Sequence, residues 1–262
     1  VMHILAMFLM MGLSQQDKGI VSTLFLYNIK NLNNSNLTLL FSSIGHAFMH
    51  MFAAFYFVIV LTIEKEWSIS YDQLIRLWTF GALLIGLGAI PFGLLSDRWS
   101  RSGTMTIMFI GMGLASILCG FSTSISFLFF SLSLLGLFCS IYHPVGIPWV
   151  INSANKQGRA LGINGIFGGV GIGSGAFVAG TLTELFNWQL AFILPGFISI
   201  FIGFVLIYLI FIGKISYKNF FIKNDKQDHS RNEMILISLI MLLSMFALGL
   251  SFHNTQTALP KV

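Results

Sequence analysis

The chain has 262 residues, of which 56% are hydrophobic and only 9% are charged, and its formal net charge is +5. A soluble domain is typically about a quarter charged, so this composition excludes an ordinary soluble fold and indicates an integral membrane protein. The basic residues lie in loops between apolar runs, a pattern that favours membrane topology over binding to nucleic acid.

The first part of the chain, residues 1–37, is an N-terminal extension to which we assign no role in the fold. Its apolar stretch Val1–Leu13 is too short to cross a bilayer, and Asn31–Asn36 is interpreted as a polar linker. The chain starts with Val rather than Met, and we therefore expect it to be a piece of a longer protein.

Six apolar runs follow, each close to or above the roughly 20 helical residues that cross a bilayer core about 30 Å thick. These runs are Leu39–Ile63, Tyr71–Leu95, Thr104–Phe121, Ile125–Ile151, Ala160–Leu185 and Asn187–Ile212. They predict an all-α membrane protein with a six-helix transmembrane bundle over residues 38–212. Residues 213–233 form a predicted cytoplasmic central loop. A further run, from Met234 to about Phe252, predicts a truncated seventh transmembrane helix within residues 234–262.

The Lys and Arg residues of the connecting loops predict an orientation, because basic residues favour the cytoplasmic side. The loops after the second, fourth and sixth runs contain nine of them, whereas the other loops contain only Lys65, with Arg76 just inside the second run. Trp67, Tyr71 and Trp188 lie at the opposite ends of the runs, as an interfacial aromatic belt would. We therefore expect a multi-pass protein of the cell inner, or plasma, membrane with a cytoplasmic N-terminus.

The loop between the second and third runs, Gly93–Arg101, has the sequence GLLSDRWSR. Gly93 allows the end of the second helix to approach a neighbouring helix closely. Asp97 can cap or pair with the positive end of a nearby helix. Arg98 and Arg101 are expected to hold the loop on the cytoplasmic side.

This loop resembles the signature G-x-x-x-D-R-x-G-R-R of the major facilitator superfamily, with Ser100 in place of the second Gly and Ser102 in place of a basic residue. The run Asn187–Gly196, in which Trp188 and Phe192 are four residues apart, resembles the opening of the sixth helix in that family. The resemblance covers about residues 38–262. It implies the first six helices and the start of the seventh in a twelve-helix fold, in which the loop latches the two halves and gates the conformational change.

The fifth run is rich in glycine, which predicts close helix packing. Gly165, Gly169 and Gly173 are four residues apart and lie along one side, as do Gly171 and Gly175. A dinucleotide-binding loop would need a preceding strand, so no cofactor is expected. Antiporters of the superfamily carry a glycine-rich motif in this helix, at the interface between the halves, although this sequence lacks the Gly-Pro pair of that motif.

Three histidines, His46, His50 and His143, are predicted at membrane depth, where ionisable residues are costly and usually functional. At about 1.5 Å per residue, His46 and His50 lie about 10 and 16 Å inside the first run, and His143 lies about 12 Å from the inner edge of the fourth. His46 and His50 are one turn apart on one face. The resemblance implies that the first and fourth helices line the central cavity, so that His46 and His143 could face each other.

These histidines are candidates for binding the substrate or carrying a coupling proton, because His titrates nearest neutral pH. The alternative is that each is neutral and hydrogen-bonded between helices. Tyr142 and Asn164 are further polar candidates. The spacing of His46 and His50 also suits a metal, but no Asp, Glu or Cys ligand is nearby in the sequence, and no metal site is expected.

The motif Gly45-His46 with His50, and the pair His143-Pro144, resemble the fosmidomycin-resistance group of efflux proteins within the superfamily. The resemblance implies secondary active transport of a small solute by alternating access, with proton-coupled efflux as one form of it. The expected partners are the solute, protons, the lipid bilayer and a missing C-terminal six-helix half. The first three and the second three helices are then expected to be inverted repeats.

Two other classes of protein compete with transport. A non-transporting membrane receptor or assembly protein would explain the apolar runs but not the Gly93–Arg101 loop. An enzyme is not expected, because the sequence shows no Ser/His/Asp arrangement, no carboxylate pair and no Walker loop.

Overall fold

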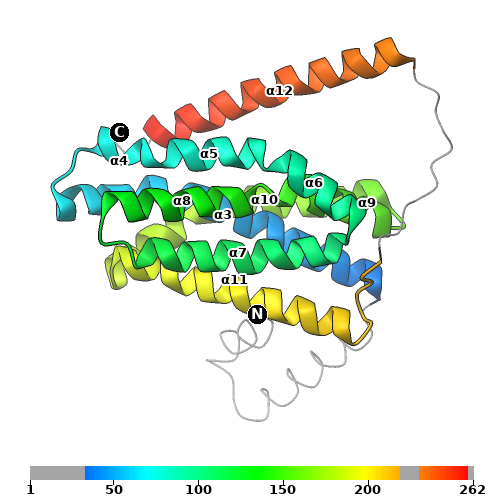
Figure 1. Cartoon of the computed structure of the whole chain (residues 1–262), viewed down its shortest axis with the longest axis horizontal. Coiled ribbons are helices and arrows are strands. Elements are labelled where there is room, and N and C mark those ends of the chain that lie inside the picture. The colour runs from blue at the N-terminus through cyan, green and yellow to red at the C-terminus, as the bar shows by residue number, and fades with distance from the viewer. Residues whose placement is uncertain (1–32, 219–229, 259–262) are drawn as a thin grey trace.

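The computed structural model describes residues 33–218 and 230–258, and all regular secondary structure in these ranges is helical (Figure 1). Six segments of this part are long and apolar enough to cross a membrane. They are α3 (Asn34–Trp67), α4 to α6 (Tyr71–Ile75, Leu77–Leu87 and Ala89–Arg98), α7 (Arg101–Gly120), α8 with α9 (Ile125–Cys139 and Tyr142–Ser153), α10 (Gln157–Leu185) and α11 (Trp188–Phe211). All six predicted spans are confirmed.

The first span begins earlier than the sequence indicated. Asn33 caps α3, because its side chain accepts a hydrogen bond from the backbone N–H of Asn36 at 2.9 Å. Asn33 and the residues after it up to Asn36, interpreted as part of a polar linker, therefore supply the cap and the first turn of a helix, and that helix starts ahead of the predicted bundle boundary at residue 38. The stretch Val1–Leu13 lies outside the described residues.

The predicted seventh run forms one helix, α12 (Arg231–Ala258), which starts inside the segment predicted as a loop. Ser230 and Glu233 form a capping box at its start. The Ser230 N–H donates to Oε2 of Glu233 at 2.9 Å, and the Glu233 N–H donates to Oγ of Ser230 at 3.3 Å. The α12 side chains that the structure describes are exposed, and α12 is not among the six spans found in the described residues.

A glycine ends the sixth span. Gly213 has a φ of 71°, which a residue with a side chain rarely adopts. This conformation lets the N–H of Lys214 donate to the carbonyl of Leu209 at 2.9 Å, and the N–H of Gly213 donate to Ile210 at 3.0 Å. The pair of hydrogen bonds is a Schellman motif, which satisfies carbonyls that the helix end would otherwise leave without partners.

Prolines interrupt the second and fourth spans. Pro91 has no N–H to donate and its ring crowds the carbonyl four residues earlier, and the helix breaks at Gly88, between α5 and α6. Pro144 acts in the same way on the carbonyl of Ser140, between α8 and α9. The two breaks touch, since a Cβ added to Gly88 would collide with Oγ of Ser140. Gly93, further along α6, would meet Pro144 Cβ at 3.3 Å.

Glycines allow the closest helix contacts in the bundle. A Cβ on Gly171 of α10 would collide with the carbonyl oxygen of Ala47 on α3. Between α5 and α8, a Cβ on Gly136 would collide with the Gly81 backbone. Between α7 and α11, a Cβ on Gly196 would meet a backbone oxygen at 2.8 Å. The backbones of these three pairs therefore lie at a distance that larger residues would not permit.

The pattern of these pairs fits an inverted repeat. In such a repeat, spans one, two and three correspond to spans four, five and six. The contact of span one with span five then corresponds to the contact of span four with span two. The contact of span three with span six corresponds to itself. The structure has all three contacts. The internal packing is therefore consistent with the repeat expected from the sequence.

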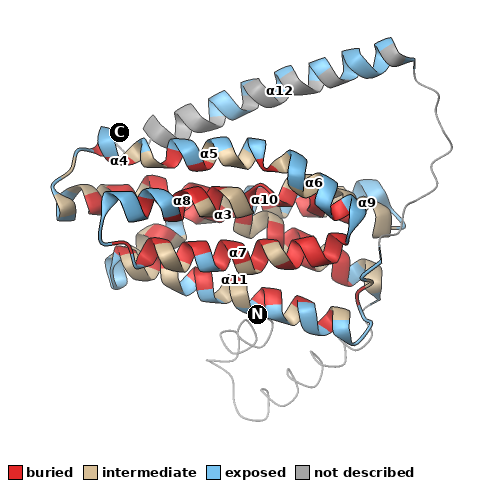
Figure 2. Ribbon diagram, in the orientation of Figure 1, coloured by how far each residue is buried: buried red, intermediate tan, exposed pale blue. Residues whose placement is uncertain are grey.

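The core runs along α3 and α7, where Figure 2 shows most of the buried residues. Both cysteines, Cys119 and Cys139, are fully buried and free. The aromatic residues expected at one membrane interface do gather at one end, where the rings of Trp67 and Trp188 are 5.8 Å apart. The Trp188 Nε1–H also donates to Oε2 of Glu66 at 2.8 Å, which closes this end of the bundle.

The predicted glycine ridge Gly165, Gly169 and Gly173 makes no close contact within the described part of the chain, and its packing stays a prediction, whereas the other predicted pair, Gly171 and Gly175, packs on α3. All three are exposed, and a Cβ on any of them would find no atom within 4 Å. The buried face of α10 instead carries Gly168, Gly171 and Gly175. Along that face the helix packs mainly against α3, and its rotation about its own axis decides which glycines meet that neighbour.

Gly171→Ala tests this packing. In the 262-residue chain we expect it to lower the free energy of unfolding by roughly 1–3 kcal/mol, because the added methyl group would push two backbones apart. Gly169→Ala is the matched control, and we expect no loss of stability, since Ala is the better helix former. Thermal unfolding of the detergent-solubilised protein measures both. Equal losses in the two variants would contradict the assigned face.

Candidate functional site

The three deep histidines lie together in the structure. His46 and His50 are on α3, and His143 is at the start of α9. The ring centroid of His46 lies 4.9 Å from that of His50 and 5.5 Å from that of His143, and the His50 and His143 rings are 5.6 Å apart. All three side chains are half-buried. The juxtaposition expected from the sequence is therefore present, and we call these three residues the histidine cluster.

A hydrogen-bonded network fixes one side of the histidine cluster. The Nδ1 atom of His46 lies 2.9 Å from the Asn164 backbone carbonyl oxygen and 3.1 Å from its side-chain Oδ1. The hydroxyl of Tyr142 donates to the same Oδ1 at 2.8 Å, and the Tyr142 ring stacks on His46 with centroids 4.5 Å apart. The Asn164 amide also donates to Ser42 Oγ at 3.2 Å. Three helices, α3, α9 and α10, thus meet at one buried amide.

Two features of the local sequence explain this placement. Ser42, His46 and His50 are spaced four residues apart, so they lie along one face of α3. Asn164 and Gly168 have the same spacing on α10, where a Cβ on Gly168 would lie 2.5 Å from Cε1 of His46. Gly168 therefore leaves the space that the His46 ring fills.

Sequence reasoning found His46, His50, His143, Tyr142 and Asn164, and the structure brings all five together. It missed Ser42 and Gly168. Both could have been found from the helical spacing, because each lies one turn from a predicted site residue and on its face. No metal site was predicted from the sequence, because no third ligand lies beside the pair on α3. In the structure His143 supplies a third imidazole from another helix.

The predicted gating loop lies at the other end of α6 from the break at Gly88. Asp97 Oδ1 accepts a hydrogen bond from the guanidinium of Arg101 at 2.9 Å, which joins the end of α6 to the first residue of α7. Arg101 is buried, whereas Asp97 and Arg98 are exposed. The pairing of Asp97 with the start of a helix agrees with the expectation from the sequence, as does the close approach of Gly93 to α9.

The two positions that depart from the family pattern have structural partners. Ser100 Oγ donates to the carbonyl of Tyr217 at 2.7 Å, and Ser102 Oγ donates to the carbonyl of Ser216 at 3.0 Å. The Ser216 N–H in turn donates to Oδ1 of Asn34 at 2.9 Å. The serines therefore bind the gating loop to the chain that leaves α11 and to the start of α3.

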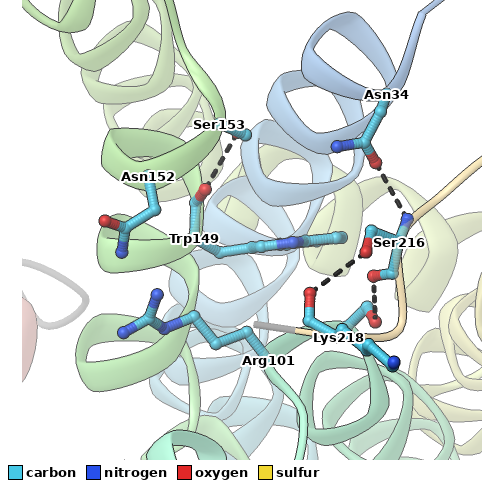
Figure 3. Close-up of a pocket in the computed structure, with 8 residues that line it drawn as sticks. Asn34, Arg101, Trp149, Asn152, Ser153, Ser216 and Lys218 are labelled. Carbon is cyan, nitrogen blue, oxygen red and sulfur yellow. Dashed lines mark hydrogen bonds between the residues drawn. The ribbon is translucent and has the colours of Figure 1, made fainter. Parts of the chain in front are cut away.

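Figure 3 shows a pocket beside this loop. Arg101, Ser102 and Lys218 lie along it, and α3 contributes Asn34. The rest of its lining comes from α9 and from the chain after α11, namely Trp149, Asn152, Ser153 and Ser216. None of the histidine cluster lines this pocket, so the loop and the cluster are separate features of one bundle.

Comparison with known proteins assigns the family. A family model described as Major Facilitator Superfamily matches residues 42–260. The riboflavin transporter RibZ of Clostridioides difficile (strain 630) is 31% identical over 147 residues, which cover 54% of this chain and 32% of that protein. An uncharacterized transporter of Buchnera aphidicola subsp. Schizaphis graminum (strain Sg) is 24% identical over 235 residues, which cover 86% of this chain and 56% of that protein.

A solved structure has a similar fold. It is a bacterial homologue of the human lysosomal transporter Spinster, in an inward-facing and unoccupied conformation, with a TM-score of 0.65 and 16% sequence identity. The match covers 74% of this chain and 46% of that one, so this chain spans only part of the length of the proteins that it resembles. The narrower resemblance to the fosmidomycin-resistance group stays a prediction.

The family and these relatives are transporters rather than enzymes. The six spans, their packing and the Gly93–Arg101 loop had pointed to the same family, and the match now extends over most of the chain. This multi-pass membrane protein belongs to the major facilitator superfamily.

Proposed function

We propose that the complete protein carries a small organic solute across the cell inner membrane by alternating access. The six described spans form one half of the transporter, and a second six-helix half packs against it. The observation that carries this proposal is the histidine cluster, three half-buried imidazoles deep within the apolar bundle. Polar groups at that depth are costly, and they are usually kept where a substrate or ion path needs them.

The cluster suits a solute with a polar ring. Its three half-buried imidazoles provide flat faces for stacking and nitrogen atoms for hydrogen bonds. The imidazole rings of His50 and His143 make no hydrogen bond within the described part of the chain, so their ring nitrogens are available to a ligand. The riboflavin named for RibZ is a solute of this chemistry, and it is the first candidate that we propose to test.

The gating loop is the second part of the proposal. In alternating access the two halves rock about the substrate site, and contacts at one end must form and break in each cycle. The ion pair of Asp97 with Arg101 and the serine contacts to the chain after α11 hold that end of the described half together. We place this end in the cytoplasm, because the loops there carry most of the Lys and Arg residues.

Flux into proteoliposomes that contain the product of the complete gene tests the transport function. We expect saturable riboflavin flux, and a roughly tenfold lower kcat/KM for His50→Ala, the loss expected when one hydrogen-bonding group is removed from a site. His229→Ala, outside the cluster, is the control. We also propose that the histidine cluster carries a coupling proton, so a pH gradient imposed across the same vesicles should drive accumulation of the solute. Absence of saturable flux for every solute tried, together with a stably bound peptide or lipid, would favour a receptor instead.

Asp97→Asn tests the gating role. We expect it to lower the maximal flux several-fold and to change the solute affinity little, because the loop acts on the conformational change rather than on the substrate. Asp72→Asn, an exposed carboxylate at the start of α4, is the matched control and should leave the flux unchanged. The account of the loop fails if Asp97→Asn transports at the normal rate.

A further inference from the structure

We propose that the histidine cluster is a binding site for a late first-row divalent metal ion such as Zn²⁺. One ring nitrogen from each of His46, His50 and His143 lies within 4.8 Å of one from each of the others. Imidazole is the ligand that these ions favour in proteins, and three protein ligands with one open position is a common arrangement for zinc. The third ligand comes from α9, which is why the sequence spacing on α3 alone did not predict a site.

The hydrogen bond to His46 fixes the tautomer that a metal needs. A carbonyl oxygen only accepts, so the Nδ1 atom of His46, 2.9 Å from the Asn164 carbonyl, carries the proton and donates it. The Nε2 atom then has a free lone pair. A histidine that binds a metal through one nitrogen typically donates the other N–H to a carbonyl or carboxylate, which orients the ring and raises its basicity.

The other two rings can complete the coordination without breaking a hydrogen bond, since His50 and His143 make none among the described residues. Zn–N bonds of about 2.0–2.1 Å at tetrahedral angles place ligand nitrogens about 3.3 Å apart. A separation of up to 4.8 Å closes to that value by small side-chain rotations within ordinary rotamer wells.

The surroundings of the cluster select the kind of ion and its fourth ligand. The described Asp and Glu residues all lie near helix ends, outside the cluster. Mg²⁺ and Ca²⁺ prefer oxygen ligands, so a site of three imidazoles disfavours them. Three neutral imidazoles also leave both positive charges of the ion uncompensated in the bundle. We therefore assign the open position to an anionic oxygen donor, supplied by hydroxide or by the solute.

This inference rests on the proposed function in one respect, namely that the ion would occupy the space in which the solute binds. Metal binding itself does not require transport. It can be measured on the detergent-solubilised product of the complete gene with the metal alone, and the flux assay can be run separately with a chelator present. The two proposals therefore fail independently.

The test is titration of the purified protein with Zn²⁺, followed by calorimetry, and with Co²⁺, whose visible absorption reports tetrahedral coordination. We expect one equivalent to bind per chain, and Mg²⁺ not to compete. His143→Ala and His50→Ala should each weaken Zn²⁺ binding by more than the roughly 10–100-fold cost of losing a supporting hydrogen bond. His143→Gln repeats the test with a side chain that keeps its polarity, and gel filtration checks that each variant is folded.

His229→Ala, in a histidine outside the cluster, is the matched control and should bind Zn²⁺ as the unaltered protein does. Failure of the unaltered protein to bind one equivalent of Zn²⁺ would overturn the proposal. Binding that survives in folded His50→Ala and His143→Gln would overturn it as well, whatever the outcome of the flux assay.

Discussion

The contact between α3 and α10 is the interaction on which the site depends. Gly171 and Gly175 let the two backbones touch, and the same face of α10 presents Asn164 and Gly168 to α3. Gly168 leaves room for the His46 ring, and Asn164 holds its Nδ1 atom. In a bilayer no hydrophobic effect drives helices together, so such an approach depends on small residues and on interhelical hydrogen bonds. Here one face of α10 supplies both the small residues and the hydrogen-bonding side chain, so the packing of the bundle also orients the His46 ring.

The breaks in the second and fourth spans also help to position the site. Proline removes a backbone hydrogen bond in the second and fourth spans, and the two breaks pack against each other where Gly88 meets Ser140. Irregular backbone at membrane depth is tolerated where protein covers it or a cavity lies beside it. Beyond the second of these breaks α9 begins, and His143 lies in its first turn. The interruption of the fourth span therefore places the third imidazole opposite the pair on α3.

Much of this architecture could be predicted from the sequence, for identifiable reasons. The six spans follow from uninterrupted apolar length, and the histidines stand out because ionisable residues are rare at that depth. The packing face of α10 was predicted only in part. Gly171 and Gly175 do meet α3, but a helix with glycines on several sides gives no hint of which side meets a given neighbour. The roles of Ser100 and Ser102 were also out of reach. Their partners, Tyr217 and Ser216, are more than 100 residues away, and only the fold brings them close.

The proposed transport by alternating access requires that the histidine cluster becomes open to water during the cycle. The most direct measurement is the reaction of His50→Cys with a membrane-impermeant thiol reagent, in vesicles containing the product of the complete gene. Cys119 and Cys139 are fully buried, and the protein without the substitution measures the background from any other cysteine. The account predicts that position 50 is modified, and that the rate falls when solute is bound. A thiol at position 50 that stays unmodified from both sides of the membrane would contradict it.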